Sequence, residues 1–332
     1  MAKTQPKRRF VALPILLAVL GIVRAAAFAQ SPVRLAVLDL AGDEGGRMAS
    51  ILREEAAKET AVPFDLLDQT LVRRAVEAAG FNRLPNLSLD EARALGQGLG
   101  CDFFISGKVL VTKRLGAGEE SHFDALAGIF LVEARTGALA HFAFELARSR
   151  EEAGAQAALE DRIRARWPEY ARQILAARQR HAEQVERIAG PPPAPAIEIL
   201  LDDRPPAGLD GPVFFQRLKP PYTEQADLAD VAATVELDAA FLDDGRIGDV
   251  VVTRWAGFGL DESAIATVRK LTFKPAELNG KVVTIRGLVR YTFRRPQAQA
   301  PRPADPGEID RLKRSLRNLK TTGKIPDPHP NF

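Results

Sequence analysis

Apolar and polar residues alternate along one stretch in the second half of the chain. From residue 231 to residue 241 every second position is apolar, and Thr234, Glu236 and Asp238 stand between the central ones. This period of two predicts a half-buried β-strand. Asp244-Gly245 follows and is a strong signal for a hairpin turn, so residues 247–255 are predicted to form the second arm of a hairpin.

A helix and a third strand are predicted to cover this hairpin, because two strands alone are only marginally stable in water. The helix is expected over residues 260–271, with acids in its first turn and basic residues in its last, as the helix dipole favours. The third strand is expected over residues 282–293. Its predicted apolar face holds Val283, Ile285, Val289, Tyr291 and Phe293. The pattern therefore predicts a small β-β-α-β domain.

Strands and helices alternate in the first half of the chain. The strands are expected over residues 33–40, 64–68 and 102–113. The helices are expected over residues 47–59, 69–80 and 89–100. A hairpin turning near Thr136-Gly137 follows, and then a helical stretch from 153 to 189 with a break before Pro168. This order predicts an α/β layered domain with partly parallel strand pairing.

Two proline-rich stretches divide the chain. The first, GPPPAPA, covers residues 190–196 and separates an expected domain at 32–190 from another at 197–296. The second begins the tail at 297–332, in which a short amphipathic helix is expected. The predicted fold class is α+β overall, with an N-terminal α/β layered domain followed by the small β-β-α-β domain.

The first 29 residues have the pattern of an export signal. Basic residues precede an apolar run at 10–23, and Ala27-Phe28-Ala29 supplies a small-residue cleavage site before Gln30. The apolar run is shorter than the roughly 20 residues of a spanning helix. A cleaved signal peptide is therefore predicted, and an uncleaved inner-membrane anchor is the alternative.

Export changes the meaning of the charge. The whole chain carries a formal net charge of +3, of which the first 29 residues contribute five positive charges and no acid. The remainder carries −2, the difference between +3 and +5. Because the basicity belongs to the export signal, no nucleic-acid partner is predicted.

The chain offers little catalytic chemistry. Cys101 is the only cysteine, so no internal disulfide can form, and it is interpreted as a buried small hydrophobe with a reactive thiol as the alternative. The four histidines lack metal-ligand spacing. Glu133 and Glu145 could face each other across the first-domain hairpin. No enzyme activity, catalytic residue, metal or cofactor is predicted.

The glycine-bearing loop after the first strand has the place of a phosphate-binding turn. It lacks the spacing of such a turn, and Asp43 and Glu44 would repel an anion there. The loop is therefore interpreted as a turn into a helix.

The second domain resembles the C-terminal domain of TonB. The resemblance rests on LKPPY before the hairpin, the turn Asp244-Gly245-Arg246, the run VVVTRWAGFGLDESAIATVRKLTFKPA, and the strand VVTIRGLVRYTF. It covers residues 197–296 and implies a periplasmic domain that captures an extended segment of an outer-membrane transporter beside its last strand.

An edge strand suits such capture, because its free N–H and C=O groups can template another strand. The predicted partner-binding residues are Val282, Val283, Thr284, Ile285, Arg286, Leu288, Arg290, Tyr291, Pro221 and Tyr222. Arg286 and Arg290 either favour an acidic peptide or are solubilising charges on a protected edge. Pro221 and Tyr222 either touch the partner or form a stiff start to the domain with a docked ring.

The first domain resembles, more weakly, the periplasmic domains grouped around CsgG, LpoB and the TolB N-terminus. The matching segments are VRLAVLDL, FDLLDQTLVRRAVEAAG, LGCDFFISGKV and LVEARTGALA. The predicted function is therefore a periplasmic TonB-family protein that binds an outer-membrane transporter or another envelope protein in transmembrane transport. The alternative is an envelope adapter without energy transduction, because residues 10–29 lack the histidine and the chain lacks the long spacer of TonB-like transducers.

Overall fold

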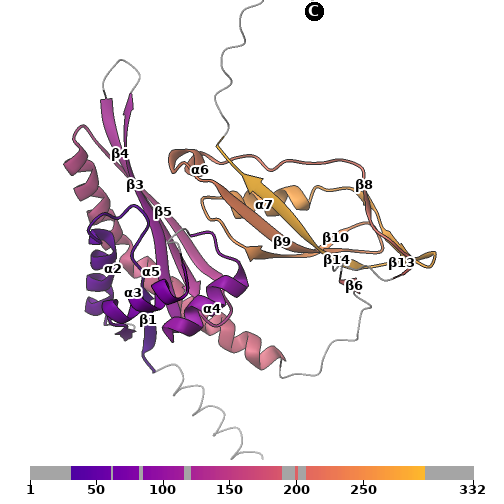
Figure 1. The fold of residues 1–332 in the computed structure, drawn as a ribbon, viewed down its shortest axis with the longest axis horizontal. Coiled ribbons are helices and arrows are strands. Elements are labelled where there is room, and N and C mark those ends of the chain that lie inside the picture. The colour runs from indigo at the N-terminus through magenta and orange to yellow at the C-terminus, as the bar shows by residue number, and fades with distance from the viewer. Residues whose placement is uncertain are drawn as a thin grey trace, which may run out of the picture. The chain divides into compact units, whose positions relative to one another are not determined.

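The structure is a computed structural model that describes six stretches of the chain (Figure 1). These are residues 31–60, 63–81, 85–115, 121–188, 199–200 and 207–295. The expected signal peptide, the proline-rich linker and the C-terminal tail with its expected helix lie outside them. Within the described stretches, no helix combines the length and the apolar character needed to cross a bilayer.

A five-stranded sheet forms the centre of the first predicted domain. Its strands are β1 (Val33–Val37), β2 (Phe64–Leu66), β3 (Phe103–Leu115), β4 (Ser121–Glu133) and β5 (Leu139–Ser149). They lie in the order β2-β1-β3-β4-β5. β1 is parallel to β2 and β3, whereas β3, β4 and β5 pair antiparallel. The predicted partly parallel pairing is confirmed.

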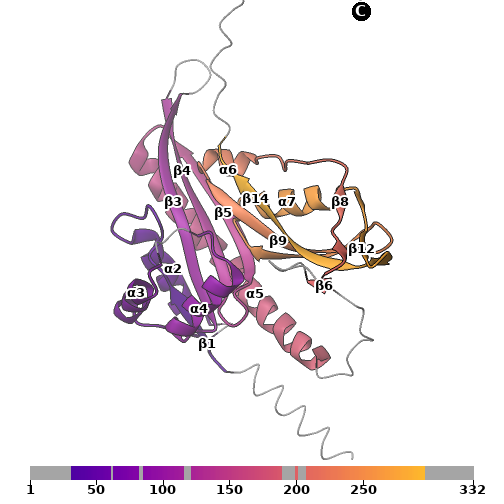
Figure 2. The same ribbon diagram turned by 45° about the vertical axis from the view of Figure 1, so that its right-hand side comes forward.

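Helices pack on both faces of this sheet, because successive strand residues point to opposite sides. They are α2 (Arg47–Lys58), α3 (Gln69–Ala78), α4 (Leu89–Leu99) and α5 (Glu152–Ile188). On one face, Leu35 and Ile129 share a buried core with α2 and α5. On the other face, Phe104 and Phe130 share a second core with α3 and α4. Figure 2 shows these helices beside the strands of the sheet.

Side chains bond to backbone N–H groups at the starts of α2, α3 and α4. Asp68 accepts two backbone N–H groups at the start of α3. Ser88 and Glu91 form a reciprocal capping box at the start of α4. Asp43 accepts two backbone N–H groups of α2. The acid of the glycine-bearing loop thus stabilises a helix start, at the position where a nucleotide-binding turn would hold an anion.

The predicted break before Pro168 is wrong, because α5 runs without interruption from Glu152 to Ile188 with Pro168 inside it. Burial on both sides of the proline explains the difference. Ile163 and Trp167 precede it, Tyr170 follows it, and all three are buried against the sheet. This packing holds the helix together although Pro168 provides no N–H for the backbone ladder.

The second predicted domain is built on a sheet with the strand order β10-β9-β14-β6. Its elements are β9 (Ala233–Phe241), β10 (Ile247–Arg254), α7 (Leu260–Val268), β14 (Ile285–Phe293) and the short β6 (Ile199–Leu200). β9 pairs antiparallel with β10 and β14. Gly245 takes a positive φ of 80° in the turn, as predicted for this hairpin. The β-β-α-β unit is confirmed.

Several short elements surround this unit. They are α6 (Glu224–Leu228), β7 (Leu209–Asp210), β8 (Val213–Phe214), β11 (Phe273–Lys274), β12 (Ala276–Leu278) and β13 (Lys281–Val283). The predicted strand over residues 282–293 is therefore wrong at its start. Val282 and Val283 belong to β13, which pairs with β12, and Thr284 separates β13 from β14. The sequence shows one continuous alternation of apolar residues here, but β13 pairs with β12 and β14 pairs with β9, so the alternation is divided into two strands.

The two predicted domains share one hydrophobic core. This core includes Phe130 of β4, Trp255 and Phe258 after β10, and Leu260 of α7. All of these side chains are buried. The β-β-α-β unit therefore packs against the same face of the first sheet as α3 and α4.

Candidate partner-binding edge and the contacts behind it

A contact that Asn86 makes with β9 shows which backbone N–H and C=O groups of β14 face away from β9. The side-chain oxygen of Asn86 accepts the N–H of Thr234 at 3.0 Å, and its side-chain nitrogen donates to the C=O of Thr234 at 2.9 Å. Both backbone groups of Thr234 therefore point away from β14. Thr234 stands opposite Thr292, so this is a non-hydrogen-bonded pair of the antiparallel ladder.

Hydrogen-bonded and non-hydrogen-bonded pairs alternate along an antiparallel ladder, so the pair at Thr292 fixes the direction of the backbone groups along all of β14. The β9–β14 register runs from Ile285 to Phe293 without a shift. The N–H and C=O groups of Leu288, Arg290 and Thr292 therefore face the edge away from β9. The intervening residues bond to β9.

β6 covers only the first part of this edge. Ile199 and Leu200 pair parallel with Ile285 and Arg286. Among the residues that the structure describes, no strand pairs with β14 on this side beyond Arg286. As far as the described residues go, the uncovered edge thus spans residues 288–293.

The exposed face of β14 carries side chains of mixed character. Leu288 is 55% exposed. The Arg290 side chain is 61% exposed, and its Nε donates to Glu236 of β9 at 2.8 Å. The Arg286 side chain is only 19% exposed and pairs with Asp238 at 2.6 Å. Both arginines are therefore engaged by acids of the neighbouring strand, and Arg290 is the more accessible of the two.

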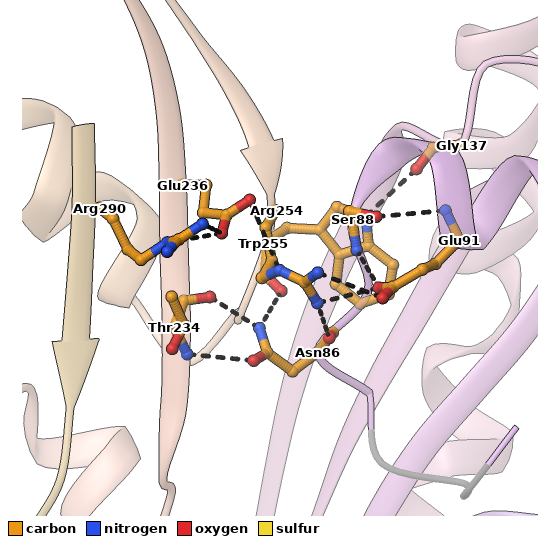
Figure 3. Close-up of polar contacts among 9 residues, drawn as sticks. All are labelled: Asn86, Ser88, Glu91, Gly137, Thr234, Glu236, Arg254, Trp255 and Arg290. Atoms are coloured by element: carbon orange, nitrogen blue, oxygen red, sulfur yellow. Dashed lines mark hydrogen bonds and ion pairs between the residues drawn. The ribbon is translucent and has the colours of Figure 1, made fainter. Parts of the chain in front are cut away.

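Asn86 and Arg254 join the β-β-α-β unit to the first part of the chain (Figure 3). Asn86 also donates to the C=O of Trp255 at 2.8 Å. Arg254 donates to the C=O of Asn86 at 3.0 Å and to both carboxylate oxygens of Glu91, at 2.9 and 3.2 Å. Although burial acts to raise the pKa of Glu91, the hydrogen bonds from Arg254 and from Ser88 lower it.

An aromatic cluster lies behind these polar contacts. The ring of Trp255 lies 5.3 Å from that of Phe130, and its Nε1 donates to the C=O of Gly137 at 3.2 Å. Phe258 lies 4.9 Å from Phe142 of β5. A Cβ at Gly128 would come within 2.5 Å of the Phe258 ring, so only glycine allows this approach.

Asp261 shapes the loop that carries Trp255 and Phe258. Its carboxylate accepts the N–H groups of Ala256 at 2.8 Å and Gly257 at 2.9 Å. Burial raises the pKa of Asp261 to about 6, against the effect of these two hydrogen bonds.

Two basic side chains of β3 donate hydrogen bonds to carbonyl groups at the C-terminal end of α6. Lys108 donates to the C=O of Ala229 at 2.8 Å, and Arg114 donates to the C=O of Leu228 at 3.1 Å. Burial lowers the pKa of Lys108. A positive charge is favourable at the C-terminal end of a helix, so these contacts add a second attachment between the two parts.

Pro221 and Tyr222 are engaged inside the chain. The C=O of Pro221 accepts the hydroxyl of Ser263 at 2.7 Å. The Tyr222 hydroxyl lies within hydrogen-bond distance of the carbonyl oxygens of Ala226 and Val231, at 3.0 and 2.7 Å, and donates its single proton between them. These contacts favour the interpretation as a stiff start to the domain with a docked ring.

The structure brings together only part of the predicted binding site. Leu288, Arg290 and Tyr291 lie on the open stretch of β14, whereas β6 covers Ile285 and Arg286. Val282, Val283 and Thr284 lie outside β14. Thr292, which the sequence analysis did not single out, joins the edge because its backbone groups point outward.

The reactive-group alternatives find no support in the described geometry. Burial raises the pKa of the Cys101 thiol to about 12, which opposes nucleophilic reactivity. The pairing of Glu133 with Glu145 is wrong, because Glu145 stands opposite Ala127 while Glu133 lies near the turn. Glu145 instead meets Tyr170 at 3.4 Å, and burial raises its pKa. Within the described residues, no cluster of three potential metal ligands occurs.

Comparison with known proteins bears on the second part of the chain. Residues 219–294 match the family described as Gram-negative bacterial TonB protein C-terminal. No curated protein matches the chain.

Solved structures give low-identity similarities to portions of the chain. The TonB C-terminal domain of Pseudomonas aeruginosa is 19% identical, with 30% of this chain and 96% of that chain covered and a TM-score of 0.24. The hypothetical protein CT253 from Chlamydia trachomatis is 11% identical, with coverages of 41% and 95% and a TM-score of 0.30. The lipoprotein GNA1162 from Neisseria meningitidis is 15% identical, with coverages of 42% and 99% and a TM-score of 0.30.

The family match covers β9, β10, α7 and β14, which are the elements of the predicted β-β-α-β unit. Residues 219–294 of this chain therefore form a TonB C-terminal domain.

Proposed function

We propose that the protein acts in the periplasm and binds an extended peptide of an outer-membrane transporter, or of another envelope protein, by adding it as a strand to β14. The open backbone edge of β14 at Leu288, Arg290 and Thr292 is the observation that carries this proposal. Strand addition takes its affinity from main-chain hydrogen bonds. The TonB C-terminal match supports an envelope partner, since domains of that family interact with outer-membrane proteins.

Amide hydrogen exchange tests the proposal directly on the exported full-length chain. In the free protein, the amides of Leu288, Arg290 and Thr292 are expected to exchange quickly, while those of Val289 and Tyr291 exchange slowly because they bond to β9. Short extended peptides selected from a displayed library should slow the three outward amides. Outward amides already protected in the free protein, or unchanged by bound peptides, contradict the proposal.

Substitution of Leu288 by proline tests the same edge by mutation. Leu288→Pro removes an outward N–H and leaves the bonds to β9 intact, so peptide affinity should fall about tenfold or more. Leu288→Ile keeps the N–H and an apolar side chain and should bind like the wild type. Because proline is tolerated on edge strands, both variants should keep the wild-type circular dichroism spectrum. Equal affinity of the two variants would argue against strand addition.

A second candidate function is an envelope adapter in which the first part of the chain contacts the partner. The attachment of the TonB domain through Asn86, Arg254 and Trp255 favours it, since a domain held this firmly has a structural role. Photo-cross-linking residues placed at Leu288 and at the exposed Leu71 of α3 separate the two functions. Cross-links to envelope proteins from Leu71 alone would support the adapter.

A further inference from the structure

We propose that an apolar patch on the TonB domain docks on a bilayer surface that carries anionic phospholipid. The patch consists of Val213, Phe215 and Val282, whose side chains are 56%, 69% and 50% exposed. Exposed apolar side chains that gather on a soluble protein mark a surface for binding a protein or a membrane. This surface is not part of the open β14 edge, and its docking does not depend on strand addition.

Two strand pairs bring the apolar side chains together. Val213 of β8 stands opposite Lys274 of β11. Val282 of β13 stands opposite Glu277 of β12. Lys274 and Glu277 form an ion pair at 2.8 Å. Because the side chains of paired residues are neighbours on one face, this ion pair connects the surroundings of Val213 and Val282. Figure 1 shows β8 and β13 at the same end of the TonB domain.

The exposure of Phe215 follows from the packing of Phe214. The Phe214 ring lies 5.3 Å from that of Phe241 and 6.0 Å from that of Phe273. The N–H of Phe215 donates to the C=O of the residue before Phe273 at 3.1 Å, which continues the pairing of β8 with β11. Successive residues of a strand point to opposite sides, so Phe215 points away from the aromatic rings, to the same side as Val213.

Basic side chains accompany the patch. The strands β7, β8, β11, β12 and β13 and residues 215–219 together carry four cations and two acids, so their net charge is +2, the difference between four and two. Arg217, Lys219 and Lys281 are exposed. Within the described residues, no acid forms an ion pair with any of these three. Apolar and basic side chains side by side bind at the interface of a bilayer that contains anionic lipid.

The charge decides against two other occupants of the patch. Symmetric contact with the patch of a second copy would bring together two surfaces with an excess of cations, and like charges repel each other. The expected helix of the tail, residues 308–320, lies outside the described residues and carries five cations and two acids, so it is basic as well. Anionic headgroups neutralise the cations of the patch, while the acyl region next to them accepts its apolar side chains.

Vesicle sedimentation with the exported full-length chain tests the docking. The probes are vesicles of phosphatidylcholine alone and vesicles that also contain phosphatidylglycerol. The chain should bind the anionic vesicles about tenfold or more tightly than the neutral ones, because each basic residue near an anionic surface adds affinity. Added salt should weaken this binding, since ions screen exposed charges. Equal binding to both kinds of vesicle, or binding to neither, overturns the proposal.

Two surface variants separate the patch from the rest of the chain. Phe215→Ser removes the exposed ring and should weaken binding to anionic vesicles about tenfold. Leu71→Ser removes a side chain of α3 that is 61% exposed and should change the binding by less than about twofold. Both variants should keep the wild-type circular dichroism spectrum, because both changes lie on the surface. The tail is present in all three proteins, so its own effect cancels. Equal binding by the two variants overturns the proposal.

Lipids with brominated acyl chains test whether the patch reaches the acyl region, because bromine quenches tryptophan fluorescence on contact. Trp167 and Trp255 are buried, at 3% and 1% exposure, so they provide a reference in every protein. Anionic brominated vesicles should quench Phe215→Trp more strongly than the wild type and more strongly than Leu71→Trp. Sedimentation without this additional quenching would show adsorption by charge alone and overturn the docking. A dimer in ultracentrifugation that Phe215→Ser abolishes would assign the patch to contact between copies and overturn it as well.

Discussion

Asn86 shows how much one side chain contributes at the residue scale. It bonds both backbone groups of Thr234, which lies 148 residues later in the chain, and the carbonyl of Trp255. These bonds engage β9 beyond the end of its pairing with β10, and together with the β9–β14 register they show which groups of β14 face outward. Leaving these part-buried backbone groups without a partner would cost free energy.

Asp261 makes the stability of the protein depend on pH. Its pKa in the folded state is raised by burial from the ordinary 3.8 to about 6. The neutral carboxyl is therefore favoured by folding, so its contribution is fully present below pH 3.8 and is lost as the pH rises through about 6. The free energy of unfolding should rise by about 2–3 kcal/mol through this group as the pH falls across that window.

The non-titrating variant Asp261→Asn isolates this effect. Urea unfolding of both proteins between neutral and mildly acidic pH gives the difference in their free energies of unfolding, in which other titrations cancel. As the pH falls, the free energy of unfolding of the wild type should increase relative to that of the variant. A difference that stays constant with pH would show that Asp261 titrates normally.

At the element scale, caps mark helix ends, but pairing partners decide where strands end. Ser88 and Glu91 form a capping box at the start of α4. The end of β13 at Val283 has no comparable signal, because the apolar alternation continues through Thr284 into β14. The strand boundary is set by the pairing partners, because β12 pairs with β13 and β9 pairs with β14.

Pro168 should lower the stability of α5. Proline in a helix interior costs about 3 kcal/mol relative to alanine, and Pro168 is exposed within an otherwise continuous helix. Pro168→Ala is therefore expected to raise the free energy of unfolding by about 1–3 kcal/mol in urea titrations. The nearby exposed change Ala165→Ser should alter it by no more than about 0.5 kcal/mol. Destabilisation by Pro168→Ala would mean that α5 requires the local geometry of proline.

At the scale of the whole molecule, the shared core joins what the sequence presents as two domains. Phe130 and Phe142 of the first sheet surround Phe258, and Trp255 fills the space beside them. Burying aromatic side chains in this way contributes several kcal/mol. Separation of the two parts would expose these rings and leave the groups bonded to Asn86 and Arg254 without partners.

The two parts should therefore unfold together. The chain has two tryptophans, Trp167 in the core of the first sheet and Trp255 in the shared core. Trp167→Phe and Trp255→Phe leave one reporter each. In each variant, the midpoint of urea unfolding by fluorescence should coincide with that by circular dichroism. Separate midpoints would show two independently unfolding domains.

Local patterns predicted most of the elements correctly, because strands and helices carry their own periods of apolar residues. The β9–β10 hairpin follows from alternation and Asp244-Gly245, and α7 follows from its helical spacing. The assumed facing of Glu133 and Glu145 failed because register depends on the position of the turn. On the proposed binding edge, alternation singled out Leu288 and Arg290. Thr292 was not singled out, because the direction of its backbone groups depends on the register between β9 and β14.

The sequence by itself determined the order of elements, the α+β class and the TonB C-terminal unit, since these follow from local periods of apolar and polar positions, turn residues and the motif of a family. Only the tertiary structure decided that Asn86 reaches Thr234, that β6 covers the start of β14, and that the rings around Phe258 form one core. These features join residues far apart in the chain, and no local period of apolar and polar positions encodes which distant surfaces meet.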